Sequence, residues 1–339
     1  MNQQADSNQP SEYFYQLTPD RILEAVEAIG IRCTGRCLAL NSMENRVYEV
    51  EIEISEDQVK SRFDRFRVIK FYRPSRWSKE QILEEHEFLL SLKAQDIPVV
   101  SPLEFQDGST LRLIPDTNIF CAVFPKVGGR APDELDNEQA ERIGRLLARL
   151  HIIGKAKNAK HRLKLSPSTY GLQNLDFLTK EKFLPKEISE TYSHTVKQIC
   201  EICSPWFEQA DYQRIHGDCH CGNVLWGTEG PFLIDFDDML MGPCVQDLWL
   251  LLPGRDEYAQ NLLNAMLRGY EQMKTFDRAT LRLIEPLRAL RMIHFSAWIA
   301  RRWQDPAFQR TFPQFAQPAY WNEQLSDLRE QLMLISGAS

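Results

Sequence analysis

Three side chains in the second half of the chain have the types and spacing that phosphoryl transfer requires. Asp218 is followed five residues later by Asn223 and, twelve beyond that, by Asp235. The reaction needs one carboxylate to accept a hydroxyl proton and oxygen ligands that hold Mg²⁺ on the phosphates of ATP. Residues 224–226 and 232–234 are predicted to be short strands joined by a turn. An antiparallel hairpin brings together the residues at its open end, so Asn223 and Asp235 are expected about one metal ion apart, beside Asp218.

A lysine in an apolar strand predicts the other half of such a site. Lys70 stands among large apolar residues, and a lysine whose stem is buried needs an anionic partner. In the helix predicted at 78–93, Glu85 lies on the apolar stripe that Ile82, Phe88, Leu89 and Leu92 form. We therefore expect Glu85 to pair with Lys70 and hold it against the α- and β-phosphates of ATP, with Glu84 as the alternative partner. A lysine at a strand edge that reaches solvent would also explain Lys70.

The segment 40–45 stands where a kinase has its phosphate-binding loop, between two strand patterns. Ser42 and Asn45 can donate hydrogen bonds to phosphate there, and asparagine tolerates turn geometry. No glycine occurs between Arg36 and Phe71, so the glycine-rich loop of protein kinases is absent. An ordinary hairpin turn remains the alternative interpretation of this segment.

The pattern of apolar residues divides the chain into a tail and two lobes. Residues 1–12 are predicted to be disordered, 13–124 to form an N-lobe of sheet and helix, 125–129 a hinge, and 130–339 a helical C-lobe with the catalytic loop and hairpin. The predicted fold is α+β and bilobal like a protein kinase, with a small antiparallel sheet, a larger helical lobe and an ATP cleft between them. Phe124 and Val127 at the hinge are expected beside the adenine.

Individual elements follow from the same patterns. Strands are predicted at 47–54, 67–72, 111–114 and 120–124, and helices at 18–28, 78–93, 138–153, 188–207 and 322–335. Further helices are expected within 243–303, where Pro286 starts or kinks one of them. The proline- and aromatic-rich residues 305–321 are predicted to form a packed loop.

Composition limits the class of protein. With 43% hydrophobic and 26% charged residues, the 339-residue chain is typical of a globular protein. A net charge of −7 argues against nucleic acid as the main partner. The chain has neither a signal peptide pattern nor an apolar run of about 18 residues, so we expect a cytoplasmic protein without a membrane span. Its eight cysteines are expected to be reduced; Cys200 and Cys203 fit a buried helix face better than a zinc site.

Other polar residues near the three carboxylate and amide groups have supporting roles in this interpretation. Asp247 could cap a helix or brace the catalytic loop through backbone bonds. His151 and His216 are expected to be structural, and Asp237 and Asp238 could add a second metal ligand. The sequence gives no indication of a chemical role for Cys219 and Cys221.

On these residues the chain resembles the aminoglycoside phosphotransferase and choline kinase group. The shared segments are HGDCHCGN at 216–223, IDF at 234–236 and GRLLARLH at 144–151. It resembles the bacterial stress response kinase A family more closely, through LNSMENRVY at 40–48, KFYRP at 70–74, QILEEH at 81–86, VGGR at 127–130, GPCVQDLW at 242–249 and EPLRA at 285–289. The resemblance implies a cytoplasmic serine/threonine protein kinase of the stress response, with Asp218 as proton acceptor, Asn223 and Asp235 holding Mg²⁺, and Ser42 in the ATP loop.

We therefore predict a monomeric kinase that uses ATP and Mg²⁺ to phosphorylate serine or threonine hydroxyls of proteins, including its own. Only a few residues separate Asp235 from Gly242, so the long peptide-binding segment of protein kinases is missing. A kinase for an amino alcohol, sugar or aminoglycoside is the main alternative. A nucleotide-sensing scaffold and a zinc-binding regulator are the others.

Overall fold

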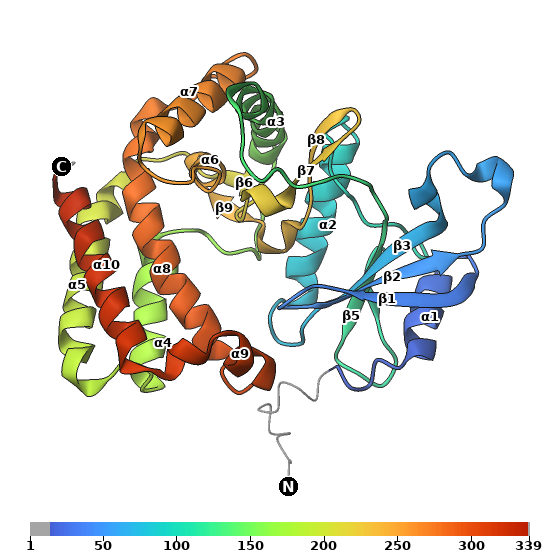
Figure 1. Ribbon diagram of the computed structural model, residues 1–339, viewed down its shortest axis with the longest axis horizontal. Helices are drawn as coiled ribbons and strands as arrows, with labels where there is room; N and C mark the ends of the chain where they lie inside the picture. Colours follow the sequence, from blue (N-terminus) through green and yellow to red (C-terminus); the bar gives the residue numbers. More distant parts are fainter. Residues whose placement is uncertain (1–13, 338–339) are drawn as a thin grey trace, which may run out of the picture.

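The computed structural model describes residues 14–337. A five-stranded sheet lies at one end of the molecule and a larger group of helices at the other, with α2 (Lys79–Lys93) between them (Figure 1). The sheet and the helices enclose separate hydrophobic cores. This is the predicted α+β, bilobal arrangement. The predicted disorder of residues 1–12 lies outside the described residues, and the exact lobe boundaries remain a prediction.

The sheet is antiparallel throughout, in the order β1-β2-β3-β5-β4. Alternation along β3 sends Ile69 and Phe71 into the core beneath the sheet, while Val68 and Lys70 point to the other face. That second face lines a large cavity, so the alternation of the strand places the Lys70 side chain in the cavity lining. The strands are β1 (Cys33–Leu40), β2 (Arg46–Ile52), β3 (Phe66–Phe71), β4 (Arg112–Leu113) and β5 (Phe120–Pro125).

The two helices of the sheet region begin where the sequence predicts. The Thr18 side chain caps α1 (Pro19–Glu27), and a reciprocal pair of bonds between Ser78 and Gln81 caps α2. Helix α1 covers one face of the sheet. The second half of α2 packs Phe88, Leu89 and Leu92 into the core of the helical region. Helix α2 therefore joins the two regions.

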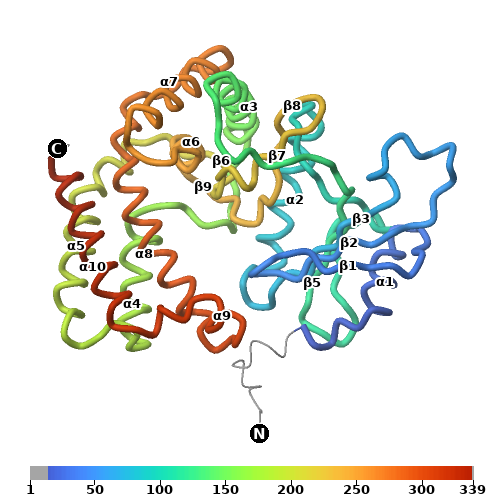
Figure 2. Tube along the Cα trace, in the orientation of Figure 1, coloured from blue at the N-terminus to red at the C-terminus, as the bar shows by residue number. Residues whose placement is uncertain are grey.

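The helical region is built around α3, α5, α7, α8 and α10 (Figure 2). Helices α3 and α7 approach closely because Gly144 faces the backbone of Met266 and Gly269 faces that of Glu141. The helices are α3 (Asn137–Lys155), α4 (Gln173–Lys180), α5 (Lys186–Glu208), α6 (Val245–Trp249), α7 (Glu257–Glu271), α8 (Ile284–Arg301), α9 (Pro306–Thr311) and α10 (Pro318–Gly337).

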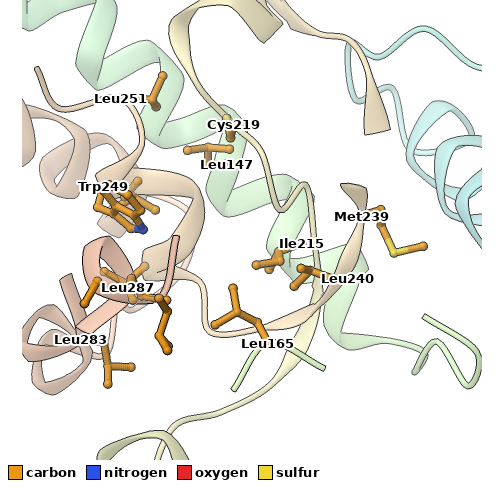
Figure 3. Packing of buried hydrophobic residues seen from close by; sticks show 14 of the residues in the cluster. Leu147, Leu165, Ile215, Cys219, Met239, Leu240, Trp249, Leu251, Leu283 and Leu287 are labelled. Carbon is orange, nitrogen blue, oxygen red and sulfur yellow. The ribbon is translucent and has the colours of Figure 1, made fainter. Parts of the chain in front are cut away.

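The candidate catalytic residues lie beside two short pairs of antiparallel strands. One pairs β6 (Gln213–Ile215) with β9 (Leu240–Gly242), and the other pairs β7 (Val224–Gly227) with β8 (Gly230–Leu233). Ile215 and Leu240 pack with Leu165 in the core beneath the loop that joins β6 to β7 (Figure 3). Cys219 lies in the same core, near Leu147 of α3. The loop is therefore fixed to a rigid base.

Most predicted elements are present, and one prediction is wrong. Residues 305–321 are not a loop: they contain α9, a short 3-10 helix (Pro313–Ala316) and the start of α10. Prolines at the first positions of these helices explain both the error and the structure, since proline is favoured in a first helical turn. Pro286 lies in the first turn of α8, so it starts that helix. Helix α4 and strands β6 and β9 were not predicted individually.

Within residues 14–337, no helix combines the length and apolar character needed to cross a bilayer.

Candidate active site

The loop after β6 takes its shape from a buried carboxylate. Asp247 of α6 is fully buried and accepts hydrogen bonds from the backbone N–H groups of His216 (2.8 Å) and Gly217 (2.9 Å), and it lies 3.0 Å from Nε2 of His151. Gly217 has φ of +86°, and a Cβ there would collide with the carbonyl oxygen of Asp238. Asp247 therefore braces the loop, one of the two predicted roles, and its side chain does not cap α6.

His216 ties this loop to the β7–β8 hairpin. Its Nε2 lies 2.8 Å from the carbonyl oxygen of Ile234, and its Nδ1 accepts a bond from the backbone N–H of Asp218. The ring is fully buried and packs against Phe236. These contacts agree with the structural role predicted for His216 and His151.

Asn223 and Asp235 flank the open end of the hairpin, as predicted from the strand pattern. The backbone N–H of Ile234 donates to the carbonyl oxygen of Asn223 at 3.1 Å, which continues the pairing of β7 with β8. The Asn223 amide nitrogen donates to the carbonyl oxygen of Asp218 at 2.9 Å. Asp235 has left-handed backbone geometry, with φ of +58°, and its side chain is 53% exposed. The hairpin thus turns sharply at the residue whose carboxylate faces the cavity.

Asp218 is held by a cation from a distant helix. Nη1 of Arg291 on α8 lies 2.8 Å from Oδ1 of Asp218, and Nε2 of His220 lies 3.5 Å from Oδ2. Burial raises the pKa of Asp218, but Arg291 and His220 outweigh it, so this pKa lies below its usual value. The carboxylate is therefore ionised and in contact with the cavity.

The predicted pairing of Lys70 with Glu85 is wrong. Nζ of Lys70 lies 3.0 Å from Oδ1 of Asp235 and 3.2 Å from Oδ1 of Asp237. Burial lowers the pKa of Lys70, but Asp235 and Asp237 outweigh it, so the pKa lies well above the usual value. Lys70 is a buried cation directed at the hairpin carboxylates, and strand-edge exposure does not describe it.

Glu85 is buried on α2, as its place on the apolar stripe predicts, and its partner is Arg162, whose Nη2 lies 2.9 Å away. Arg162 also donates to the carbonyl oxygen of Gln81, so it attaches α2 to the segment before the π-helix (Pro167–Leu172). Glu84 accepts from three backbone N–H groups of this same segment, at 160–162. Both glutamates therefore fix α2 to the helical region, and nothing in the local sequence around Arg162 indicates this contact.

The Asp237 and Asp238 carboxylates are held by Arg76, which the sequence interpretation missed. Arg76 bonds Asp237 and lies 2.7 Å from Asp238. Burial raises the pKa of Asp237, but Lys70 and Arg76 outweigh it and hold this pKa well below the usual range. Asp237 is 3% exposed and ionised, so it serves as the counter-ion of two cations from the sheet region.

The loop 40–45 lies over the cavity and touches the helical region. Ser42 lines the cavity, as predicted. Asn45 is occupied elsewhere: its Nδ2 donates to Asp237 at 3.1 Å and its Oδ1 accepts from the backbone N–H of Arg73 at 3.0 Å. The expected donation from Asn45 to phosphate is therefore replaced by a structural role in this state of the loop.

One cavity of about 1040 Å³ lies between these groups, and the predicted residues Asn223 and Asn45 are not among those that line it. It is lined by residues of the sheet, of α2, of the catalytic loop and of α8, and its lining includes the predicted Ser42, Lys70, Glu85, Phe124, Val127, Asp218 and Asp235. Phe124 and Val127 lie at the hinge side of this lining, on β5 and just after it. A volume of this size is at the upper end for a single small-molecule site, so it has room for a nucleotide and part of an acceptor.

The donor set fits a magnesium ion better than zinc. The bond from its Nδ2 leaves Oδ1 of Asn223 as the amide atom that can bind a cation, and the Asp235 carboxylate is accessible from the cavity. Carboxylate and amide oxygens are hard ligands of the kind Mg²⁺ prefers. Among residues 14–337, no group of three histidines, cysteines or acids is arranged to hold a metal ion. Cys200 and Cys203 are buried in α5, where desolvation raises the pKa of each thiol to about 12.

Comparison with known proteins agrees with this architecture. Residues 39–284 match the family model "Phosphotransferase enzyme family". The chain is 38% identical over 323 residues to stress response kinase A of Escherichia coli K12, covering 95% of this chain and 94% of that protein. It is 36% identical to serine/threonine protein kinase RdoA of Salmonella typhimurium, with the same coverage.

A solved structure has the same fold. The amicoumacin kinase hAmiN, solved with AMP-PNP, Ca²⁺ and Ami, superimposes with a TM-score of 0.69 at 20% identity, covering 91% of this chain and 94% of that one. The sequence and fold comparisons therefore agree, and the chain belongs to the stress response kinase A family within the phosphotransferase enzymes and is a kinase.

Proposed function

We propose that this kinase transfers the γ-phosphoryl group of ATP to serine and threonine hydroxyls of proteins. The observation that carries this proposal is the convergence of Asp218, Asp235 and Lys70 on one cavity large enough for nucleotide and acceptor. The name of the Salmonella relative, a serine/threonine protein kinase at 36% identity, supports a protein acceptor. The cytoplasm is the expected compartment and a monomer the expected state.

In this mechanism the nucleotide lies between the sheet and the hairpin. Phe124 and Val127 contact the adenine, Ser42 donates to phosphate, and Lys70 exchanges part of its contact with Asp235 for the phosphate oxygens. Asp218 orients the acceptor hydroxyl and takes its proton as the hydroxyl oxygen bonds to the γ-phosphorus. The bond from that phosphorus to the β,γ-bridging oxygen breaks, and ADP leaves with the electron pair.

Asn223 and Asp235 are the residues that would hold Mg²⁺, which, when bound, neutralises charge on the phosphates. Asp237 remains a buried counter-ion of Arg76 and Lys70 during the reaction. In this scheme Glu85 fixes the position of α2 through its ion pair with Arg162. Helix α2 contributes residues to the lining of the cavity that also contains Lys70.

A small-molecule acceptor is the second candidate, and one observation favours it. Only residues 236–239 separate Asp235 from β9, so no long segment is available there to bind an extended peptide. The similarly folded hAmiN is named as a kinase of amicoumacin. An acceptor panel separates the two candidates.

The test uses γ-labelled ATP and Mg²⁺ with the full chain, a denatured protein mixture and a set of small amino alcohols, sugars and aminoglycosides. We expect labelled phosphoserine or phosphothreonine in the protein fraction or in the kinase itself. Label only in small alcohols would overturn the protein acceptor and leave phosphoryl transfer in place. Absence of label from every acceptor, with no ADP formed, would contradict the kinase mechanism.

A further inference from the structure

One face of α8 forms the wall of the cavity opposite the sheet. Residues at three- and four-residue steps along this helix and just after it line the cavity: Leu287, Leu290, Arg291, His294, Phe295, Trp298, Arg301 and Arg302. Leu287 and Leu290 are buried, whereas the Arg291 side chain is 41% exposed and Arg301 is exposed. The wall thus combines buried apolar residues with accessible cations.

Arg291 and Arg301 are two cations on this wall. Arg291 is paired with Asp218 through a contact of 2.8 Å, and its side chain is 41% exposed. Arg301 donates to the neutral side-chain oxygen of Asn174 at 2.8 Å and lies over the ring of Phe177. Within residues 14–337, no ion pair includes Arg301. Its charge is therefore available to an anion that enters the cavity.

Arg302, in contrast, is paired with a carboxylate of the sheet region. It pairs with Glu44 of the loop 40–45, and Trp298 donates to the same carboxylate at 2.8 Å. These bonds tie the wall to the loop of the sheet region and pair the charge of Arg302 with a carboxylate. Arg302 is therefore not available to an incoming anion, in contrast to Arg301.

The local electrostatics are positive although the chain has a net charge of −7. His294 lies between the two arginines along α8, stacked on Tyr170 with ring centres 4.1 Å apart. Burial lowers the pKa of His294, and Arg301 and Arg291 lower it further, to about 3. The largest charge effects on this ring come from arginines, so a neutral histidine stands beside several cations.

We propose, building on the protein kinase function above, that the acceptor is an acidic segment with a carboxylate side chain next to the reacting serine or threonine. Arg291 binds this carboxylate and in doing so releases Asp218, while Arg301 holds a second acidic side chain. Arg291 occupies Oδ1 of Asp218, and it can leave this contact and free the whole carboxylate for the acceptor hydroxyl only if it gains a replacement anion. The acceptor's own charge provides that replacement, so substrate binding and freeing of the base are one event.

The experiment compares three peptides that differ only in the residues flanking one serine: glutamate, glutamine or lysine. The full-length kinase, ATP and Mg²⁺ are used, and kcat and KM are measured separately. We expect kcat/KM to be about 10- to 100-fold higher for the glutamate peptide than for the lysine peptide, the effect of one or two charge-assisted bonds.

Variants of Arg301 test the wall without touching Asp218. Arg301→Glu should remove or reverse the preference, mainly through KM, and Arg301→Lys should retain most of it. Arg282→Glu is the matched control, because Arg282 is exposed, lies outside the cavity lining and changes the net charge equally. Circular dichroism melting of each variant checks that it is folded.

The outcomes are distinguishable. Phosphorylation of all three peptides at similar rates, or a preference that Arg301→Glu leaves unchanged, would overturn the acidic acceptor while the protein kinase function stands. Label in small alcohols and in none of the peptides would overturn the protein kinase function, and the acidic segment with it.

Discussion

His86 illustrates how burial and polar partners set the charge of a single residue. It is 1% exposed, with Nε2 at 2.9 Å from the Tyr72 hydroxyl and Nδ1 at 2.8 Å from the Thr110 hydroxyl. Burial lowers its pKa to about 3, and Lys70 and Arg162 act in the same direction. The ring is neutral in the folded protein over the whole range in which a free histidine titrates.

This pKa predicts a pH dependence of stability. Below pH 6.5 the unfolded chain binds a proton at His86 that the folded chain does not, so the stabilisation by the neutral ring is complete above pH 6.5 and declines as the pH falls toward 3. Between pH 6.5 and 5 this residue alone should lower the unfolding free energy by about 2 kcal/mol. Urea unfolding of wild type and His86→Gln over this range measures it. Equal pH slopes for the two proteins would contradict the assignment.

Some contacts between site residues can be predicted from the sequence, and others cannot. Asp218, Asn223 and Asp235 lie within one loop and one hairpin, so their spacing predicts their proximity. The burial of Glu85 also follows from helix periodicity. The ion-pair partner of Glu85 does not follow from periodicity. Arg162 and Lys70 are both cations near α2, and the path of the chain decides which of them contacts Glu85.

At the scale of elements, the contact between α3 and α7 depends on the absence of a side chain. A Cβ on Gly144 would stand less than 3.0 Å from the backbone carbonyl of Met266. Alanine is favoured over glycine inside a helix by about 1 kcal/mol, but a backbone clash in a packed interface costs about 1–3 kcal/mol. The clash should win, because neither helix can move without disturbing the core beneath the catalytic loop.

Gly144→Ala should therefore lower the unfolding free energy by up to about 2 kcal/mol, the difference between these effects. Thermal or urea unfolding measures the change. Gly254→Ala is the control, since a Cβ there meets no atom within 4 Å and should leave stability nearly unaltered. A Gly144→Ala protein as stable as wild type would show that α3 and α7 separate easily.

The boundaries of helices and strands were predictable where the local sequence contains a helix-capping residue or a turn. Ser78 and Thr18 cap helices, and the predicted β7–β8 hairpin is present, although its strands extend to Gly227 and Gly230 and so shorten the predicted turn. The short strands β6 and β9 pair with each other across the 24 residues that separate them, and three-residue strands leave no periodic pattern. The proline-rich residues after 305 form helices because aromatic packing around Phe315 and Trp321 outweighs their loop-like composition.

At the scale of the whole molecule, Glu44 joins the loop 40–45 to α8. Its carboxylate lies 3.2 Å from Nε of Arg73 and 2.7 Å from Nε of Arg302, and it is 8% exposed. The two lobes were predictable from strand and helix patterns, but this contact spans more than 250 residues, and no local pattern reports it. It fixes the phosphate-side loop in its closed position.

Glu44→Gln should open this loop and raise the KM for ATP by roughly tenfold, the effect of losing one charge-assisted contact. Steady-state kinetics with varied ATP measure the change. Glu51→Gln is the control, because Glu51 pairs with the exposed Arg36 and surface pairs contribute little. A KM that is unaltered in Glu44→Gln would mean that the loop position does not depend on α8.

The most direct measurement compares wild type with Asp218→Asn in nucleotide binding and in turnover. Asparagine keeps the shape and the hydrogen bond to Arg291 but cannot accept the acceptor's proton. The account predicts a kcat about 10²- to 10⁴-fold lower, with the Kd for ATP and Mg²⁺ unchanged within a factor of about two. Turnover at the wild-type rate would contradict the assignment of Asp218 as the base, and a comparable loss of nucleotide affinity would mean that Asp218 acts in binding instead.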